Sequence, residues 1–187
     1  MKEIILATNN QGKVKEIQEI LKDYKILSLK EANINIEVEE NQETFEGNAL
    51  KKAKEICKLT NKICIADDSG LCIEELGGFP GVKTARFLGE DATQDERNTY
   101  ILNKMKNILN RKAKVITCIA VVRPDENYNI YTGVLEGNIS KEKRGTNGFG
   151  FDEIFEISDG RTLAELDSKE KNKISSRKRA LEQIKDI

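Results

Sequence analysis

Short apolar segments alternate along this chain with segments in which apolar residues recur at helical spacing. Glu3–Thr8 is short, apolar and β-branched, which is typical of a buried strand. Residues 45–57 carry an apolar stripe that predicts an amphipathic helix. Further on, Lys114–Val122 and Tyr128–Ile139 predict two long strands joined by a turn. Strands that both interleave with helices and form a hairpin predict an α/β fold, with a mixed central sheet flanked by helices.

Capping residues and apolar spacing predict the remaining elements. Thr93 and Glu96 have the spacing of a capping box, in which each side chain satisfies a backbone donor at the start of a helix. The apolar face behind that box includes Leu109. Asp167 and Ser175 are suited to cap one or two closing helices. We also expect a helix that carries Val14, Ile17, Ile20 and Leu21, strands at Tyr24–Leu29 and Ile63–Ala66, and inward-facing Ala180, Leu181 and Ile184.

The length and the composition place limits on the class of protein. A chain of 187 residues without a repeat, low-complexity tract or linker predicts a single domain over residues 1–187. Its start does not resemble a signal peptide, and no apolar stretch approaches the roughly 18 residues that cross a bilayer. Four cysteines, at positions 57, 64, 72 and 118, lack C-x-x-C spacing and are expected to be buried thiols. These features predict a cytoplasmic protein with no membrane partner.

The charged residues narrow the possible partners and chemistry. Lys and Arg total 31 and Asp and Glu total 32, so the formal net charge of -1 creates no general attraction for nucleic acid. The chain also has no histidine, which excludes an imidazole as base, metal ligand or member of a catalytic triad. Any enzymatic chemistry must therefore use carboxylates, lysines, arginines and a hard metal ion.

The segment Thr8–Lys13 leaves the first predicted strand and enters the first predicted helix. Such a turn presents backbone N–H groups at the positive end of the helix, and this geometry binds phosphate. Lys13 adds a positive charge, and Thr8 and Asn10 add neutral hydrogen-bonding groups. The alternative is an ordinary strand–helix turn, because the glycines of a P-loop or a dinucleotide fingerprint are missing.

Two adjacent carboxylates, Asp67 and Asp68, follow directly on a predicted buried strand. Adjacent acids at a strand end are costly unless a metal or another cation neutralises them. Mg²⁺ takes carboxylate and phosphate oxygens, polarises a phosphoryl group and lowers the pKa of an attacking water. The alternative is an Asx turn with a solvated pair of acids. Glu37, Glu39 and Glu40 could complete a metal site if their acidic connector folds over the same edge of the sheet, although such a run is usually a solvated face.

A glycine-rich loop, Gly145–Asp152, combines backbone donors with the rings of Phe149 and Phe151. Glycines let a backbone approach a ligand closely, and an aromatic ring can stack on a base. The alternative is a hairpin loop with core phenylalanines. A basic segment follows at 169–179, in which one or two inward-facing cations could bind phosphate. Together these features predict a nucleotide and a divalent metal as ligands. They do not decide whether the protein is a hydrolase, a kinase or a nucleotide sensor.

The motifs and their order resemble those of the inosine triphosphate pyrophosphatase (dITP/XTP pyrophosphatase) family. The resemblance covers almost the whole chain. In the closing motif the family normally has Ser-His-Arg, whereas this chain has Ser176 in place of the histidine. The matching motifs are Thr8-x-Asn10-x-x-Lys13, Ala66-Asp67-Asp68-Ser69-Gly70-Leu71, Gly77-Gly78-Phe79-Pro80-Gly81-x-x-Thr84-Ala85-Arg86-Phe87, Phe149-Gly150-Phe151-Asp152, Ala164-Glu165, Glu170-Lys171 and Ile174-Ser175-x-Arg177.

The resemblance implies an elongated, two-lobed α/β fold with the active site in the groove between the lobes, and a homodimer. It implies hydrolysis of non-standard purine nucleoside triphosphates (dITP, ITP, XTP) to the monophosphate and pyrophosphate, with Mg²⁺ as cofactor. Phosphoanhydride hydrolysis needs charge neutralisation and an aligned water, which lysines, a carboxylate and a metal ion supply without histidine. Serine at position 176 is shorter than histidine and never cationic, so base selectivity stays open.

The resemblance also implies roles for individual residues. Asp68 would accept a proton from water and would bind the metal ion together with Glu39. Ser69 would contact the substrate, and Lys52 and Lys171 would neutralise phosphate. The remaining substrate contacts would be Thr8, Asn9, Asn10, Gln11, Gly12 and Lys13 at the triphosphate, and Phe149, Gly150, Phe151, Asp152, Ser176 and Arg177 at the base and sugar.

Two other functions stay open from the sequence. A related Maf-type nucleotide pyrophosphatase would act on modified pyrimidines or m7GTP, but the acid pair and the segment from Lys171 to Arg177 favour the first family. The second is a nucleotide-binding protein that has lost catalysis, which Ser176 suggests. A panel of substrates separates the two enzymes, and binding without turnover would identify the binding protein.

Overall fold

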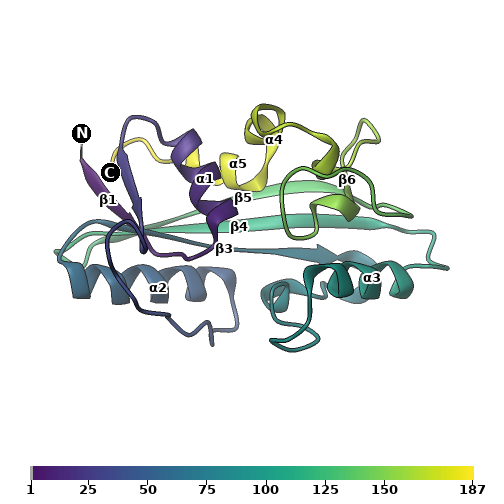
Figure 1. Cartoon of the computed structure of the whole chain (residues 1–187), viewed down its shortest axis with the longest axis horizontal. Helices are drawn as coiled ribbons and strands as arrows, with labels where there is room; N and C mark the ends of the chain where they lie inside the picture. Colours follow the sequence, from purple (N-terminus) through teal and green to yellow (C-terminus); the bar gives the residue numbers. More distant parts are fainter. Residues whose placement is uncertain (1) are drawn as a thin grey trace. The chain divides into compact units, whose positions relative to one another are not determined.

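The computed structural model describes residues 2–187 and contains one six-stranded sheet. The strands are β1 (Glu3–Leu6), β2 (Lys25–Ser28), β3 (Cys64–Ile73), β4 (Lys112–Val122), β5 (Tyr128–Ile139) and β6 (Phe155–Glu156). In the sheet they follow the order β2-β1-β3-β4-β5-β6 (Figure 1). β1 pairs in parallel with β2 and β3, whereas β5 and β6 are antiparallel. The predicted mixed sheet is therefore confirmed.

Helices flank the sheet, as predicted. Within residues 2–187 the α-helices are α1 (Gln11–Ile20), α2 (Phe45–Thr60), α3 (Gln94–Lys104), α4 (Ser168–Ile174) and α5 (Ser176–Leu181). The 3-10 helices are η1 (Glu74–Leu76), η2 (Gly81–Lys83), η3 (Asp152–Ile154) and η4 (Leu163–Glu165). These single turns were not predicted, because three residues are too few to show a period.

Capping residues set the helix ends. Thr93 Oγ1 accepts a hydrogen bond from the backbone N–H of Glu96 at 3.1 Å, and Glu96 Oε2 accepts one from the N–H of Thr93 at 2.7 Å. The predicted capping box of α3 is therefore confirmed. Asp167 caps α4 through a second capping box. Ser175 is the C-cap of α4, because its ψ of 154° lies outside the helical range, and α5 begins at the next residue.

Contacts within the chain divide it into two compact units. The first unit comprises residues 2–68, 117–133 and 176–187, and the second comprises residues 69–116 and 134–175. The boundary at Asp68 and Ser69 falls inside β3, so this strand contributes to both units. The single domain and the groove between two lobes stay predictions.

In the first unit, α1 and α5 cover one face of the sheet and α2 covers the other (Figure 1). Ile17 of α1, Ile65 of β3, and Ala180 and Leu181 of α5 belong to one buried hydrophobic cluster, and Ile184 packs against it. The predicted inward direction of the last three residues is confirmed. Apolar packing thus holds both helices against the strand that carries the two aspartates.

In the second unit, α3 packs on a separate core. Ile101 and Met105 are fully buried together with Phe155 of β6. β6 was not predicted, because a strand of two residues shows no alternation. The prediction that Leu109 belongs to the apolar face of this helix is wrong, since its side chain is 99 % exposed. α3 ends at Lys104, and helical spacing no longer applies to residues beyond its end.

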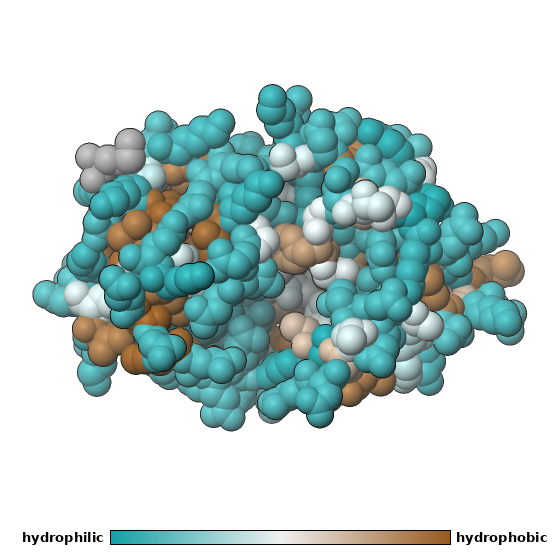
Figure 2. Space-filling model, in the orientation of Figure 1, coloured by the Kyte–Doolittle hydropathy of each residue, from teal (hydrophilic) through white to brown (hydrophobic). Residues whose placement is uncertain are grey.

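The surface agrees with a chain in which 34 % of the residues are charged. Hydrophilic residues cover most of the face shown in Figure 2, and hydrophobic residues show between them. Among the described residues, no helix combines the length and the apolar character of a membrane span. All four cysteines are free thiols; three are buried, as predicted, and Cys72 is half-buried.

Candidate functional site

The two adjacent aspartates lie inside β3 rather than after its end. The strand continues through both residues to Ile73, so the predicted strand end before them is wrong. Successive side chains of a strand point to opposite faces of a sheet. Asp67 contacts Lys13 of α1 and Arg177 of α5, whereas Asp68 contacts Asn48 of α2. Strand alternation therefore gives the two carboxylates different surroundings.

Asp67 is fully buried between two cations. Its Oδ2 accepts hydrogen bonds from Arg177 Nε at 3.2 Å and Nη2 at 2.9 Å, and its Oδ1 forms an ion pair with Lys13 Nζ at 3.3 Å. Burial would raise the pKa of this carboxyl, but Lys13 and Arg177 outweigh burial and hold its pKa well below the usual range. Arg177 also pairs with Glu16 of α1. Asp67 is therefore an ionised member of a charge network.

Asp68 is also buried, but its surroundings favour the protonated form more strongly. Its Oδ2 accepts a hydrogen bond from Asn48 Nδ2 at 3.0 Å. Desolvation by burial raises the pKa of Asp68 to about 6, although the positive charge of Lys52 acts in the opposite direction, and the negative charge of Glu40 adds to the rise. A carboxylate with a pKa near neutrality can accept a proton from water and release it again.

The acidic connector reaches this cluster through Lys52 of α2. Lys52 Nζ donates a hydrogen bond to the backbone carbonyl of Asp67 at 2.7 Å and another to the carboxylate of Glu40. Glu39 is exposed, and its Oε2 accepts a hydrogen bond from Asn41 Nδ2 at 3.2 Å. The structure thus brings Glu40 to the cluster and leaves the carboxylate of Glu39 on the surface of the connector.

The turn between β1 and α1 presents the start of a helix. Asn10 is the N-cap of α1: its Oδ1 accepts a hydrogen bond from the backbone N–H of Lys13 at 3.2 Å. The N–H of Asn10 in turn donates to Thr8 Oγ1 at 3.1 Å. Asn9, Asn10 and Gln11 are exposed. The predicted strand–helix turn is confirmed, and its contact with phosphate stays a prediction.

In the second unit, the glycine-rich loop closes around Asp152. Asp152 Oδ2 accepts hydrogen bonds from Lys171 Nζ at 2.6 Å and from the backbone N–H of Phe149 at 3.1 Å. Lys171 Nζ also lies 4.5 Å from the centre of the Phe149 ring. A Cβ atom at Gly148 would lie 2.1 Å from Asp152 Oδ2 and would displace that carboxylate, and the positive φ of 73° at this position also favours glycine. Three residues predicted to bind substrate therefore come together.

A cavity of about 410 Å³ lies beside this loop. Its volume falls within the range of small-molecule sites, about 300–1,000 Å³. Asn98 of α3 fixes one wall, because its Nδ2 donates hydrogen bonds to the carbonyl of Gly150 at 3.1 Å and to Glu153 Oε1 at 3.0 Å. Phe151 instead packs on Phe155, with the ring centres 6.4 Å apart. The loop thus contributes backbone groups and the aromatic ring of Phe149 to the cavity.

Ser176 and Arg177 lie in the first unit, whereas the glycine-rich loop lies in the second. Ser176 is buried, and its Oγ is 2.7 Å from Thr117 Oγ1, so one hydroxyl donates to the other. Arg177 is held by Asp67 and Glu16. The role of both residues at the base stays a prediction.

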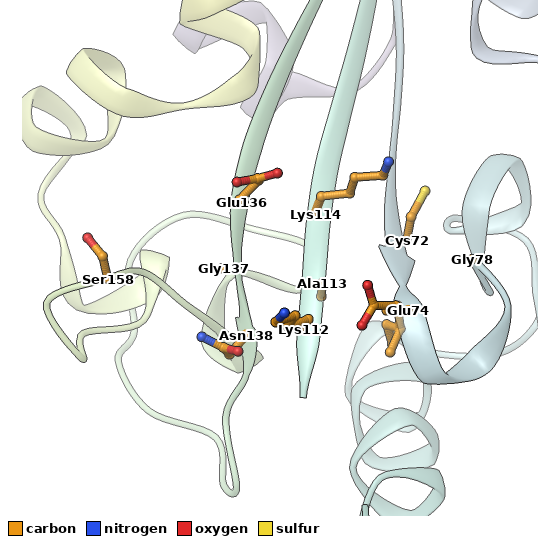
Figure 3. Close-up of a pocket in the computed structure, with 11 residues that line it drawn as sticks. Cys72, Glu74, Gly78, Lys112, Ala113, Lys114, Glu136, Gly137, Asn138 and Ser158 are labelled. Atoms are coloured by element: carbon orange, nitrogen blue, oxygen red, sulfur yellow. The ribbon is translucent and has the colours of Figure 1, made fainter. Parts of the chain in front are cut away.

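A larger cavity of about 720 Å³ also lies in the second unit (Figure 3). Cys72 of β3, Lys114 of β4 and Glu136 of β5 line it. The residues around it include none of those predicted to bind substrate or metal. The aspartates of β3 in the first unit and the glycine-rich loop in the second therefore remain the candidate functional regions.

A sequence profile of the Ham1 family matches residues 4–187. The chain belongs to the Ham1 family. It is 45 % identical to the dITP/XTP pyrophosphatases of Clostridium tetani and of Bacillus subtilis over 192 residues, which cover 100 % of this chain and 96 % and 97 % of those proteins.

Solved Ham1 structures have the same fold. The Staphylococcus aureus Ham1 protein is 38 % identical, with a TM-score of 0.87 over 97 % of this chain and 95 % of that one. A HAM1 protein from Coxiella burnetii is 42 % identical, with a TM-score of 0.88 over 98 % and 96 % of the two chains. The α/β fold is therefore shared with the Ham1 family.

Asp68 and Glu40 are two carboxylates of this Ham1 family member whose chemistry suits a divalent metal ion, and the expected role of Glu39 stays a prediction. Both offer hard oxygen ligands, and a cation beside Asp68 would offset the cost of burying its charge. No group of three or more Cys, Asp or Glu side chains within residues 2–187 is arranged to hold a metal alone. Mg²⁺ is usually bound by one or two carboxylates together with substrate phosphates, so the two carboxylates suit a site that the substrate completes.

Two residues of the cluster were not singled out from the sequence. Asn48 is fully buried and links Asp68 to the connector, since its Oδ1 accepts a hydrogen bond from the backbone N–H of Gln42 at 2.9 Å. Asn48 precedes Lys52 by four residues, which places both on one face of α2. That spacing was the available signal for Asn48. No local sequence pattern indicated that Glu16 would pair with Arg177.

Proposed function

We propose that this protein hydrolyses non-standard purine nucleoside triphosphates, such as dITP, ITP and XTP, to the monophosphate and pyrophosphate. The observation that carries the proposal is the buried Asp68, whose pKa is raised to about 6, in the same unit as the strand–helix turn at Lys13. Full-length identity of 45 % to two proteins named dITP/XTP pyrophosphatase supports this substrate class.

The first unit would carry out the phosphoryl chemistry. Asp68 would accept a proton from the water that attacks the α-phosphorus, as the bond from that phosphorus to the bridging oxygen breaks. Pyrophosphate would leave with the bridging oxygen. Lys13 and Lys52 would neutralise the charge of the phosphates, helped by the N–H groups of the turn that contains Thr8 and Asn10.

A divalent metal ion, which we propose to be Mg²⁺, would be held by Asp68 and by one carboxylate of the acidic connector. The resemblance matched Glu39 to the second ligand, but the contact of Glu40 with Lys52 supports Glu40. When bound, the ion would supply charge neutralisation at the phosphates. Glu40→Gln should then raise the Mg²⁺ concentration needed for half-maximal activity, whereas Glu39→Gln should leave it unchanged.

The second unit would select the base. Hypoxanthine and xanthine carry an acceptor at O6, where adenine carries an amino donor. Backbone N–H groups of the loop 145–150 are donors of the required kind, and so is the ammonium group of Lys171, to which the resemblance gives a role at phosphate. A donor left unpaired by adenine would cost roughly 1–3 kcal/mol. Phe149 would stack on the base, and Asp152 would keep Lys171 in place.

The reaction would remove deaminated purines from the nucleotide pool. We propose a cytoplasmic enzyme, which the free state of the four thiols supports. We also propose a homodimer, as the family resemblance implies.

Incubation with MgCl2 and dITP tests the function. dIMP and pyrophosphate should form in a roughly 1:1 ratio, as required when the α–β bond is cut. Asp68→Asn should abolish turnover while nucleotide binding survives. Orthophosphate as the sole phosphorus product would contradict the proposed bond cleavage. Faster hydrolysis of modified pyrimidine nucleotides or m7GTP than of ITP would favour the Maf-type reaction, and binding of ITP without turnover would favour a binding protein.

A further inference from the structure

Four charged side chains join three elements of the first unit into one network. Lys13 and Glu16 belong to α1, Asp67 to β3 and Arg177 to α5. Lys13 contacts Asp67, Asp67 contacts Arg177, and Arg177 contacts Glu16. The side chains of Asp67, Arg177 and Glu16 are 0 %, 6 % and 9 % exposed, whereas Lys13 is 15 % exposed. Lys13 is therefore the most exposed member.

Stability alone does not explain this arrangement. Replacing a buried ion pair by well-packed apolar side chains is often neutral or stabilising, because desolvation offsets the attraction between the charges. A network of two positive and two negative groups, nearly all of it buried, therefore gives little net stability for the desolvation free energy that it costs. A role in holding one of its members at a defined place accounts for that cost, and the outermost member is the lysine of the turn Thr8–Lys13.

The hydrogen bonds assign separate tasks to the two oxygens of Asp67. Both Arg177 nitrogens bond to Oδ2, which fixes the plane of the carboxylate. Oδ1 then faces Lys13 Nζ at 3.3 Å. Glu16, three residues after Lys13 on α1, binds the other side of Arg177. The guanidinium group thus ties α1 to β3 at the level of Lys13.

We propose that Asp67 is a positioning residue that holds the ammonium group of Lys13 in place to bind the polyphosphate of the substrate, and that Arg177 and Glu16 hold Asp67. The inference rests on the proposed function for the identity of the substrate. It adds a division of labour between the neighbouring aspartates: Asp68 touches the reacting atoms, and Asp67 acts through Lys13.

A double-mutant cycle with Asp67→Asn and Lys13→Ala tests the proposal. The measured quantities are the Kd for inorganic pyrophosphate in MgCl2, by calorimetry, and KM and kcat for dITP. Lys13→Ala and Asp67→Asn should each raise Kd and KM by roughly 10- to 100-fold, the usual loss of a charged hydrogen bond. In the Lys13→Ala background, Asp67→Asn should add less than about twofold, since a residue that acts through Lys13 has nothing left to position.

A merely structural role gives a different result. The effect of Asp67→Asn on Kd would then multiply with that of Lys13→Ala instead of disappearing in that background, whatever the shift in the thermal unfolding midpoint that loss of a buried charge causes. Glu3→Gln is the matched control, because Glu3 is a carboxylate of the same unit that, like Asp67, pairs with two cations, in this case Lys25 and Lys62 at the surface. It should leave Kd, KM and kcat unchanged.

Glu16→Gln keeps the cycle informative if Asp67→Asn does not fold, because Glu16 is the last member in the series of contacts that begins at Lys13. It should raise Kd for pyrophosphate in the same direction by a smaller factor, and lose this effect in the Lys13→Ala background. Multiplicative effects in both cycles would overturn the proposal. Wild-type protein that binds pyrophosphate with this coupling but hydrolyses no nucleotide would overturn the proposed function and support the inference. Turnover of dITP together with multiplicative effects would support the proposed function and overturn the inference. A wild-type protein that shows neither the coupling nor turnover would overturn both.

Discussion

Replacing Arg177 by methionine removes the cation shared by two buried carboxylates. Arg177→Met keeps much of the length of the side chain without its charge. The side chains of Asp67 and Glu16 are 0 % and 9 % exposed, so water has little access to replace the lost partner at either group. Breaking a buried ion pair by removing one partner costs about 3–5 kcal/mol. Lys13 still contacts Asp67, so we expect a loss of about 3 kcal/mol in the free energy of unfolding, at the low end of this range.

The pH dependence of that loss identifies its cause. In the wild type, the pKa of Asp67 is held below its unfolded value, so its stabilising effect is present above the unfolded pKa of about 3.9 and disappears as the pH falls through the folded pKa. In the variant, Lys13 opposes the effect of burial without the help of Arg177, so the pKa of Asp67 rises above its wild-type value and protonation relieves the charge imbalance. The difference in stability between wild type and variant should therefore shrink as the pH falls from 7 towards 4.

Urea unfolding at several pH values, followed by circular dichroism, measures this difference. Arg161→Met is the matched control, because Arg161 also pairs with two carboxylates, Asp159 and Glu170, but at the surface. Exposed pairs contribute about 0–1 kcal/mol, so this variant should lose little stability. A loss for Arg177→Met below about 1 kcal/mol, or one that is the same at every pH, would refute the reasoning about the buried charges.

Three further predictions use other parts of the structure. Initial rates should show that kcat/KM falls as the pH drops through about 6, where Asp68 becomes protonated. Asn48→Ala should move this fall to higher pH, because the hydrogen bond from Asn48 lowers the pKa of Asp68. An unchanged pH profile in the variant would show that Asp68 is not the titrating base. Gly133→Ala places a Cβ 2.0 Å from the carbonyl oxygen of Ser176. Thermal unfolding should show a loss of roughly 1–3 kcal/mol, and an unchanged midpoint would mean that the backbone is not packed this closely. Leu109→Ser should change the stability by less than about 0.5 kcal/mol, since Leu109 is 99 % exposed, and a larger loss would place that side chain in a core.

Local patterns in the sequence predicted the elements whose causes are local. The long hairpin, the helix Phe45–Thr60 and the capping box at Thr93 were found because alternation, helical spacing and capping depend only on nearby residues. Leu109 shows the limit of this reasoning. Its spacing fits the helix before it, but the chain leaves the helix at Lys104.

The arrangement of the candidate site depends on long-range contacts that local patterns do not contain. The sequence marked Asp67 and Asp68 as a pair, but which of them meets Arg177 depends on the helices that cover each face of β3. The choice between Glu39 and Glu40 depends in the same way on the path of the connector over Lys52. The residue types were therefore predictable, whereas their partners required the fold.

Because both aspartates lie within one continuous strand, the surroundings of each depend on whether it occupies an odd or an even position along that strand. An inserted or deleted residue upstream in β3 would turn both side chains to the opposite faces of the sheet, so that Asp67 would point towards α2 and Asp68 towards α1 and α5. Each residue would still be an aspartate, but it would no longer contact the side chains on which its proposed role depends. Evolution can therefore vary the loops around this strand more freely than it can change the number of residues between Cys64 and Asp68.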